Sequence, residues 1–83
     1  INYLEDTPDA VRARATALAE RIRDNAPLSV MAGKESIMTA MSAGCEAGMA
    51  LAHNIYRTAY ASEDAQEGPR AFAEKRKPVW KGC

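Results

Sequence analysis

Apolar side chains recur at intervals of three and four residues along almost the whole chain. This spacing places them on one face of an α-helix, whereas a half-buried β-strand would need strict alternation of apolar and polar residues. Alanine is abundant, and strand signals are nearly absent after residue 4. The pattern therefore predicts an all-α structure of three to four helices.

Prolines and small polar residues indicate where the first helices begin and end. Thr7 can cap the first helix, and Pro8 suits its first turn, where a missing N–H has no cost. This helix should stop before Pro27, because a residue that precedes proline is biased away from the helical region. One stripe of the helix is apolar and is expected to be buried; its members are Val11, Ala15, Leu18 and Ile22.

Pro27 can open a second helix that runs to about Ser42, and Gly44 is expected to mark its end or a short turn. A third helix is predicted from residue 45 or 46 to residue 61, and its apolar residues on more than one face suit packing against two neighbours. Cys45 is expected to be a small buried side chain, and His53 to be packed or at an interface. Ordinary filling of gaps in a core is the favoured role of the methionines, although flexible thioethers would also suit a pliable lining for an apolar ligand; they are Met31, Met38, Met41 and Met49.

Ser62 supplies the cap of a fourth helix, whose first turn is acidic. Pro69 follows Gly68 and is expected to interrupt or kink this helix, because proline removes one hydrogen bond and clashes with the preceding turn. The remainder, from residue 70 to about residue 76, should carry Phe72 on its inner side and stop by Pro78. The tail beyond contains Trp80, which is too large to lie wholly in water without a reason.

The overall charge is balanced, with 11 basic and 11 acidic residues. This balance argues against partners that need a global field, such as nucleic acid or an anionic membrane. Residues 70–83 nevertheless hold five basic side chains against one acidic side chain, so a local anion is the natural partner of this end. No apolar run approaches the ~20 residues of a membrane span. With two cysteines, no CxxC and a lone histidine, no metal site is predicted, and reduced thiols fit a cytoplasmic protein.

The last quarter of the chain carries an ordered series of short motifs: Ser62-Glu63-Asp64, then Glu67-Gly68, then Phe72-Ala73-Glu74-Lys75-Arg76-Lys77-Pro78. Upstream lie Ala17-Leu18-Ala19-Glu20-Arg21-Ile22 and Ala26-Pro27-Leu28. This series resembles the C-terminal helical segment of the enoyl-CoA hydratase/isomerase (crotonase) superfamily, and the match is collinear over essentially all of the chain. Pro69 departs from the pattern, since a small or apolar residue is more usual after the glycine.

The resemblance implies a fold of β/α spiral turns followed by a helical region, with residues 1–83 as that helical domain and residues 1–6 as the linker from the spiral domain. In such enzymes the helical region covers the acyl-CoA pocket and packs between subunits of a trimer, often a dimer of trimers. The catalytic groups lie in the spiral domain, so no catalytic residue is expected here. No cofactor is expected other than a coenzyme A thioester as substrate. Hydratases, isomerases, dehalogenases and hydrolases share this scaffold, which leaves the reaction type open.

The resemblance also assigns two residues to coenzyme A. Phe72 matches the family's aromatic residue beside the coenzyme, and Lys75 matches the lysine that approaches its phosphates, commonly in the adjacent subunit. Residues three apart share a helix face, so both side chains can meet one ligand. The alternatives are core packing for Phe72 and a solvated surface for Lys75. The carboxylates of Glu63, Asp64 and Glu67 are explained by their place at a helix start.

The expected function is therefore that of an acyl-CoA-binding and oligomerisation segment in an enoyl-CoA hydratase-type lyase of fatty-acid or related acyl-CoA breakdown. The segment alone is not expected to be catalytic. Its exposed apolar faces predict self-association. The alternative is a non-catalytic helical module for protein interaction.

Overall fold

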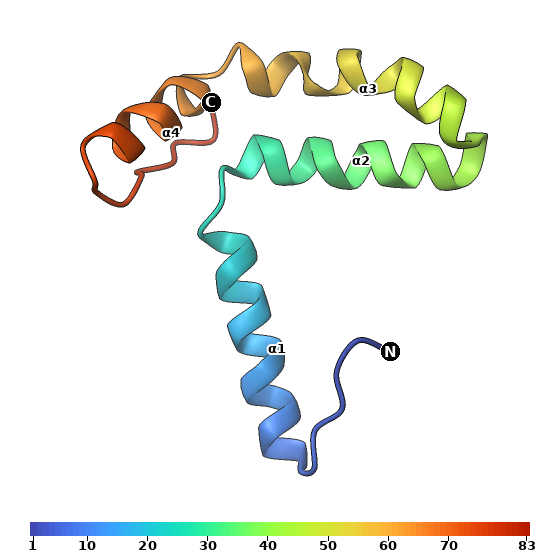
Figure 1. Ribbon diagram of the computed structural model, residues 1–83, viewed down its shortest axis with the longest axis vertical. Helices are drawn as coiled ribbons and strands as arrows, with labels where there is room; N and C mark the ends of the chain where they lie inside the picture. Colours follow the sequence, from blue (N-terminus) through green and yellow to red (C-terminus); the bar gives the residue numbers. More distant parts are fainter.

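The computed structural model describes residues 1–83 and contains four α-helices and no β-strand. The helices are α1 (Pro8–Arg23), α2 (Pro27–Ala43), α3 (Cys45–Tyr60) and α4 (Glu63–Ala73). Figure 1 shows their arrangement: α2 and α3 run side by side, α1 projects away from them, and α4 lies at the open end of the pair with the tail folded back along it. The all-α prediction is confirmed, and none of the helices is long and apolar enough to cross a membrane.

The antiparallel pair of α2 and α3 is the main packing unit of the chain. A single residue joins the two helices, and this residue is Gly44, whose φ of 91° lies in a region that side chains disfavour. Close approach is possible because Gly48 faces Ala40: a β-carbon added to Gly48 would lie 2.7 Å from the Ala40 Cα. The predicted turn at Gly44 is therefore confirmed.

The helix α1 makes no substantial contact with the other helices and has no buried residue. Its apolar stripe was predicted to be buried, but Val11 and Ile22 are 52% and 57% exposed. Only the N-terminal segment folds back on the helix, where the Glu5 carboxylate pairs with Arg14 at 2.7 Å and the Arg14 guanidinium lies 4.9 Å from the centre of the Tyr3 ring. The prediction of burial is wrong within this chain because no neighbouring helix covers the stripe.

The four helices do not enclose a common core. The buried apolar side chains are all alanine, namely Ala32, Ala59 and Ala71. The radius of gyration is 16.0 Å, whereas a compact chain of this length would have about 12 Å. Cys45 and all four methionines are exposed, so the predictions of a buried thiol and of methionines that fill a core are wrong for this chain. These side chains lie on helix faces that nothing in the chain covers.

The helix α4 begins as predicted, since Ser62 Oγ accepts the Ala65 N–H at 3.2 Å. The prediction of an interruption at Pro69 is wrong, because one continuous helix spans Glu63–Ala73 with Pro69 inside it. The preceding residue explains this outcome. Gly68 has no β-carbon, which removes much of the steric conflict between a proline ring and the residue before it.

The end of α4 also differs from the prediction. The helix stops at Ala73 rather than near Arg76, because Lys75 adopts a left-handed conformation with a φ of 54°. Phe72 was expected on the inner side of the helix, but it is 87% exposed. It lies on the outer face because the tail returns along a different side of α4, where the acidic side chains are.

Candidate functional site

The two residues that the sequence assigned to coenzyme A lie next to each other at the end of α4. The Lys75 N–H donates a hydrogen bond to the Phe72 carbonyl at 3.2 Å, and both side chains are exposed. A shared helix face does not bring them together, since Lys75 lies beyond the last helical residue. A tight turn does so instead. The Lys75 ammonium has no ion-pair partner in the chain, and no hydrogen bond engages it.

This turn has the hydrogen bonds of a Schellman motif. The Lys75 N–H bonds to the Phe72 carbonyl, and the Arg76 N–H bonds to the Ala71 carbonyl at 3.0 Å. Glycine usually occupies the left-handed position, because a β-carbon there costs about 1–2 kcal/mol. Here lysine occupies it. Ala71 is 1% exposed, so the turn is anchored to one of the few buried residues of the chain.

Arg76, directly after the turn, is bound by two carboxylates. Its guanidinium contacts Glu67 through two hydrogen bonds of 2.5 and 3.0 Å and Glu74 through one of 2.5 Å. The same Glu67 carboxylate accepts the Val79 N–H at 2.8 Å. The hydrogen bonds from Arg76 and then from Val79 lower the pKa of Glu67 to about 2, so this carboxylate is ionised at neutral pH.

The other two acidic residues of α4 hold the tail. Asp64, only 3% exposed, accepts the N–H groups of Lys81 at 2.7 Å and Gly82 at 2.9 Å. Glu63 forms an ion pair of 2.6 Å with Lys81, which raises the pKa of that lysine. In return the Cys83 carbonyl accepts the N–H groups of Glu63 and Asp64, at 2.8 and 3.3 Å. Two of the free N–H groups at the start of α4, those of Glu63 and Asp64, are thus satisfied by the tail of the same chain.

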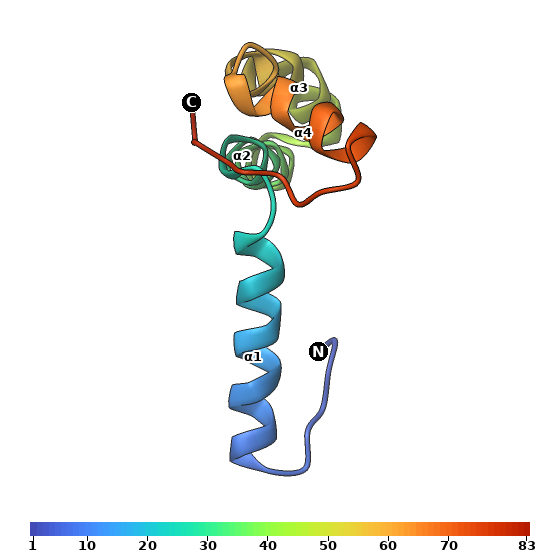
Figure 2. The same ribbon diagram turned by 90° about the vertical axis from the view of Figure 1, so that its left-hand side faces the viewer.

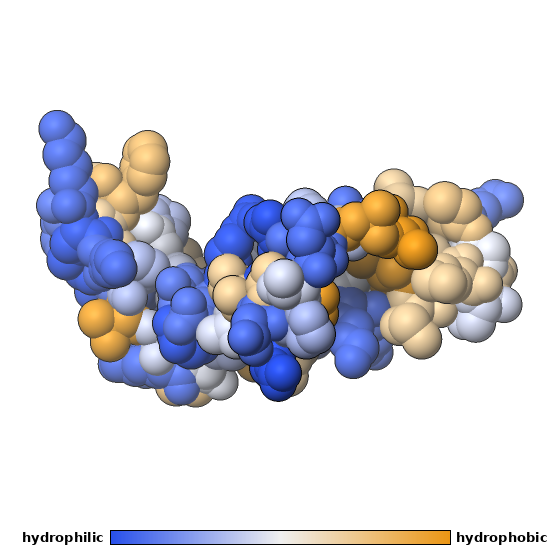
Figure 3. Space-filling model, turned by 90° about the horizontal axis from the view of Figure 1, so that it is seen from below, coloured by the Kyte–Doolittle hydropathy of each residue, from blue (hydrophilic) through white to orange (hydrophobic).

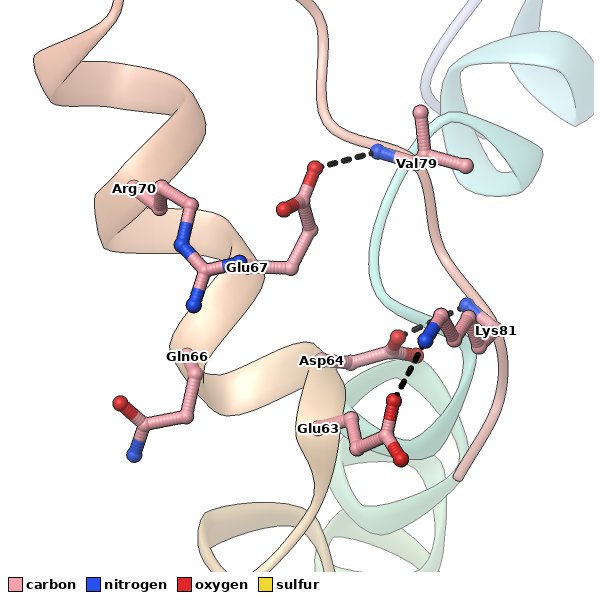
Figure 4. Close-up of a pocket in the computed structure, with 7 residues that line it drawn as sticks. All are labelled: Glu63, Asp64, Gln66, Glu67, Arg70, Val79 and Lys81. Carbon is pink, nitrogen blue, oxygen red and sulfur yellow. Dashed lines mark hydrogen bonds and ion pairs between the residues drawn. The ribbon is translucent and has the colours of Figure 1, made fainter.

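These contacts line a polar cleft of ≈ 280 Å³ between α4 and the tail. Figure 4 shows the side chains around it, with Glu67 directed to Val79 and with Glu63 and Asp64 directed to Lys81. Seven residues line the cleft: Glu63, Asp64, Gln66, Glu67, Arg70, Val79 and Lys81. Phe72 and Lys75 are not among them. The carboxylates around the cleft serve as acceptors for backbone and side-chain groups of the tail. The sequence did not indicate this role because the partners lie far along the chain.

Trp80 joins the tail to the junction of α1 and α2. Its indole N–H donates to the Asp24 carbonyl at 2.9 Å, and its ring faces Gly68 of α4, where a β-carbon would lie 3.5 Å away. Figure 2 shows the tail passing beside the start of α2, where Pro27 lies close to Gly82. The expectation that Trp80 would not lie wholly in water is confirmed, since it is half-buried.

Two other candidate features are not part of this site. His53 lies on α3 and is exposed. No group of three or more histidine, cysteine, aspartate or glutamate side chains is arranged to hold a metal ion. The end of α4 therefore presents an exposed aromatic residue and an exposed lysine without an ion-pair partner, both on one tight turn that the tail supports.

Comparison with known proteins agrees with the motifs that the sequence carries. The chain is 43% identical over 79 residues to carnitinyl-CoA dehydratase of Citrobacter koseri, which covers 88% of this chain and 30% of the relative. It is 44% identical over 72 residues to carnitinyl-CoA dehydratase of Proteus mirabilis, which covers 82% of this chain and 28% of the relative. The chain thus spans about 30% of the length of these curated relatives.

Solved structures show the same helical arrangement. The enoyl-CoA hydratase of Mycobacterium tuberculosis superimposes with a TM-score of 0.88 at 38% identity, covering 100% of this chain and 32% of that chain. A probable enoyl-CoA hydratase/isomerase of Mycobacterium abscessus gives a TM-score of 0.85 at 43% identity, with the same two coverages. The family model described as enoyl-CoA hydratase/isomerase matches residues 6–83. With this match over nearly the whole sequence, and with helices that superimpose on those of solved hydratases, the chain belongs to the enoyl-CoA hydratase/isomerase family.

Proposed function

We propose that this chain is the acyl-CoA-binding and oligomerisation segment of an enzyme that hydrates 2-enoyl-CoA thioesters. Membership of the enoyl-CoA hydratase/isomerase family supports the proposal, as do relatives that are named dehydratase or hydratase of coenzyme A compounds. The observation that carries it is the pairing of Phe72, 87% exposed, with the unpaired cation of Lys75 one tight turn away.

The chemistry of this pair suits coenzyme A. An aromatic ring in water gains free energy when an apolar or flat group covers it. A lysine without a carboxylate partner can contact phosphate oxygens through charge-assisted hydrogen bonds. Coenzyme A offers both kinds of group. The Lys75 N–H bonds to the Phe72 carbonyl within one turn, and this link supports the proposal that a single ligand meets both side chains.

The catalytic groups of the proposed reaction are assigned outside these residues. Hydration of a 2-enoyl thioester adds water across the α,β double bond, and backbone amides stabilise the negative oxygen that develops. In this proposal the acidic residues of α4 are not catalytic, because Asp64 and Glu67 already accept hydrogen bonds from the tail.

The role in assembly rests on the apolar side chains of α2 and α3 that remain exposed: Met31, Ile37, Met38, Met41, Met49 and Leu51. Each would contribute up to about 1.5–3 kcal/mol if fully buried against another surface. In Figure 3 the apolar residues, orange and tan, gather towards the side on which the α2–α3 pair extends, and hydrophilic residues predominate at the opposite end. Such a surface favours association with other protein surfaces.

The coenzyme A contact is tested by Lys75→Ala in the full-length protein. Loss of a charge-assisted hydrogen bond of about 1.5–3 kcal/mol should raise the dissociation constant for butyryl-CoA about 10- to 100-fold, measured by isothermal titration calorimetry. The turnover number should change less than the affinity. Lys77→Ala, which removes a neighbouring exposed cation, is the matched control and should leave binding unchanged. An unaltered dissociation constant in Lys75→Ala would refute the contact.

The assembly role is tested by sedimentation velocity. The unchanged protein should self-associate, and Met41→Glu, which places a charge on the exposed face of α2, should reduce the association. Lys34→Glu is the control for a charge change on the same helix. A strictly monomeric profile of the unchanged protein would contradict this role. Self-association without hydration of crotonyl-CoA would favour a non-catalytic interaction module instead.

A further inference from the structure

We propose that Glu67 and Arg76 are positioning residues that hold the Phe72–Lys75 turn in the form that binds acyl-CoA. The inference rests on the proposed role of this turn in acyl-CoA binding. Neither Glu67 nor Arg76 is assigned to the ligand: each acts through the backbone conformation of Lys75.

Lys75 does not stabilise its own backbone conformation. Its φ of 54° lies in the left-handed region, which lysine disfavours. Its side chain forms no hydrogen bond or ion pair that would offset the cost. A residue kept in such a conformation is held there by its surroundings.

The surroundings on one side of the turn are supplied by Arg76. Its N–H bonds to the Ala71 carbonyl, and its guanidinium bonds to both oxygens of Glu67. Glu67 and Ala71 are four residues apart and therefore lie on one face of α4. The residue after the turn is thus attached to this face twice, once through its backbone and once through its side chain.

The surroundings on the other side are supplied by Glu67. This carboxylate is 15% exposed, and one of its oxygens accepts both the Arg76 guanidinium at 2.5 Å and the Val79 N–H at 2.8 Å. It therefore closes the chain between Arg76 and Val79 into a loop attached to α4. Movement of Lys75 out of the left-handed region would pull Arg76 away from its two attachments to α4, at Ala71 and Glu67.

The consequence concerns affinity. Without the Glu67–Arg76 pair, Lys75 would relax to an ordinary backbone conformation, and its ammonium would move relative to the Phe72 ring. Both ligand-contacting side chains would still be present, but they would no longer match one ligand. The pair should therefore influence acyl-CoA binding without touching acyl-CoA.

The test uses Arg76→Ala, the conservative Arg76→Lys and the near-isosteric Glu67→Gln in the full-length protein. Crystal structures give the φ of Lys75, and calorimetry gives the dissociation constant for butyryl-CoA. We expect Arg76→Ala to lose the positive φ and to weaken binding about tenfold. Arg76→Lys and Glu67→Gln should each retain part of the affinity. Lys77→Ala removes an exposed cation that directly follows Arg76 and has no ion-pair partner; it is the matched control, with both measurements unchanged.

The outcomes separate this inference from the proposed function. If Arg76→Ala and Glu67→Gln keep both the positive φ and the affinity while Lys75→Ala loses affinity, the positioning role is overturned and the coenzyme A contact stands. If Lys75→Ala leaves the affinity unaltered, the coenzyme A contact is refuted, whatever the φ of Lys75 is in the other variants. If Arg76→Ala does not fold, the φ of Lys75 and the dissociation constant in Arg76→Lys and Glu67→Gln test the positioning role instead. A lost turn with unchanged affinity would also overturn the positioning role.

Discussion

Asp64, in the first turn of α4, accepts the backbone N–H of Lys81 at 2.7 Å across a separation of 17 residues. The second oxygen of the same carboxylate accepts the N–H of Gly82 at 2.9 Å. Because Asp64 is 3% exposed, these bonds are shielded from water. The start of α4 and the tail therefore form one structural unit, and the turn with Phe72 and Lys75 connects them.

Replacement of Asp64 should release the tail. Asp64→Ala leaves two partly buried N–H groups without an acceptor, so we expect the free energy of unfolding to fall by about 2–3 kcal/mol, measured by urea denaturation. Asp64→Asn should cost less, because its amide oxygen can still accept one bond. Asp9→Ala is the control, since Asp9 is exposed and its ion pair with Arg12 is long at 3.6 Å. Equal stabilities of Asp64→Ala and Asp9→Ala would contradict this role.

Substitution of Gly48 should disrupt the α2–α3 pair. The added β-carbon would lie 2.6 Å from the Ala40 Cβ and 2.7 Å from its Cα, and the backbone must shift to relieve the overlap. We expect Gly48→Ala to lower the free energy of unfolding by about 2 kcal/mol in urea denaturation.

Gly33→Ala is the matched comparison for this prediction. Its β-carbon would meet only the Tyr56 hydroxyl, at 3.2 Å, which can move. The helix preference of alanine over glycine, about 0.5–1 kcal/mol, should offset that movement, so stability should stay close to that of the unchanged protein. A larger loss of stability in Gly33→Ala than in Gly48→Ala would show that α2 and α3 do not make their close contact at Gly48.

Replacement of Lys75 by glycine should separate stability from binding. Glycine adopts the left-handed conformation without steric cost, although it also gains entropy in the unfolded chain. We expect Lys75→Gly to raise the free energy of unfolding by about 0.5–1 kcal/mol while it weakens butyryl-CoA binding, because the ammonium is lost. Thermal denaturation and calorimetry on the same sample measure the two effects. A destabilised Lys75→Gly protein would mean that the φ of Lys75 is not positive in solution.

The contribution of Glu67 to stability should decline at acid pH. Its pKa in the folded chain is lowered from 4.5 to about 2, so the folded state binds the proton less readily than the unfolded state. The stabilising effect should therefore be complete above pH 4.5 and decline as the pH falls from 4.5 to 2. Urea denaturation should show the difference between the unchanged protein and Glu67→Gln shrinking across this range. A difference that is constant with pH would indicate that the ion pair with Arg76 does not form.

The local features of the fold were predictable from the sequence because they depend on neighbours along the chain. Thr7 and Ser62 cap their helices as expected: Thr7 Oγ1 accepts the Ala10 N–H at 3.1 Å, and Ser62 Oγ accepts the Ala65 N–H at 3.2 Å. Both bonds span three residues, so short motifs suffice to predict them. The ordered motifs of the last quarter likewise led to the correct family.

The features that the prediction missed depend on residues far apart in the chain. Nothing local indicates that Glu67 pairs with Arg76 and Val79, or that Asp64 holds Lys81, because these partners meet only when the tail folds back. The exposure of Phe72 follows from which face of α4 the tail covers.

The sequence by itself thus determined the helices, their caps and the family, since hydrogen bonding and side-chain preference within a few residues decide these. Only the tertiary structure decided that Pro69 continues the helix, that Lys75 turns the chain in a left-handed conformation, and that the apolar faces of α1, α2 and α3 remain uncovered. The physical reason is that burial and backbone strain depend on what lies opposite each residue in space, and a periodic pattern shows which face is apolar but not what covers it.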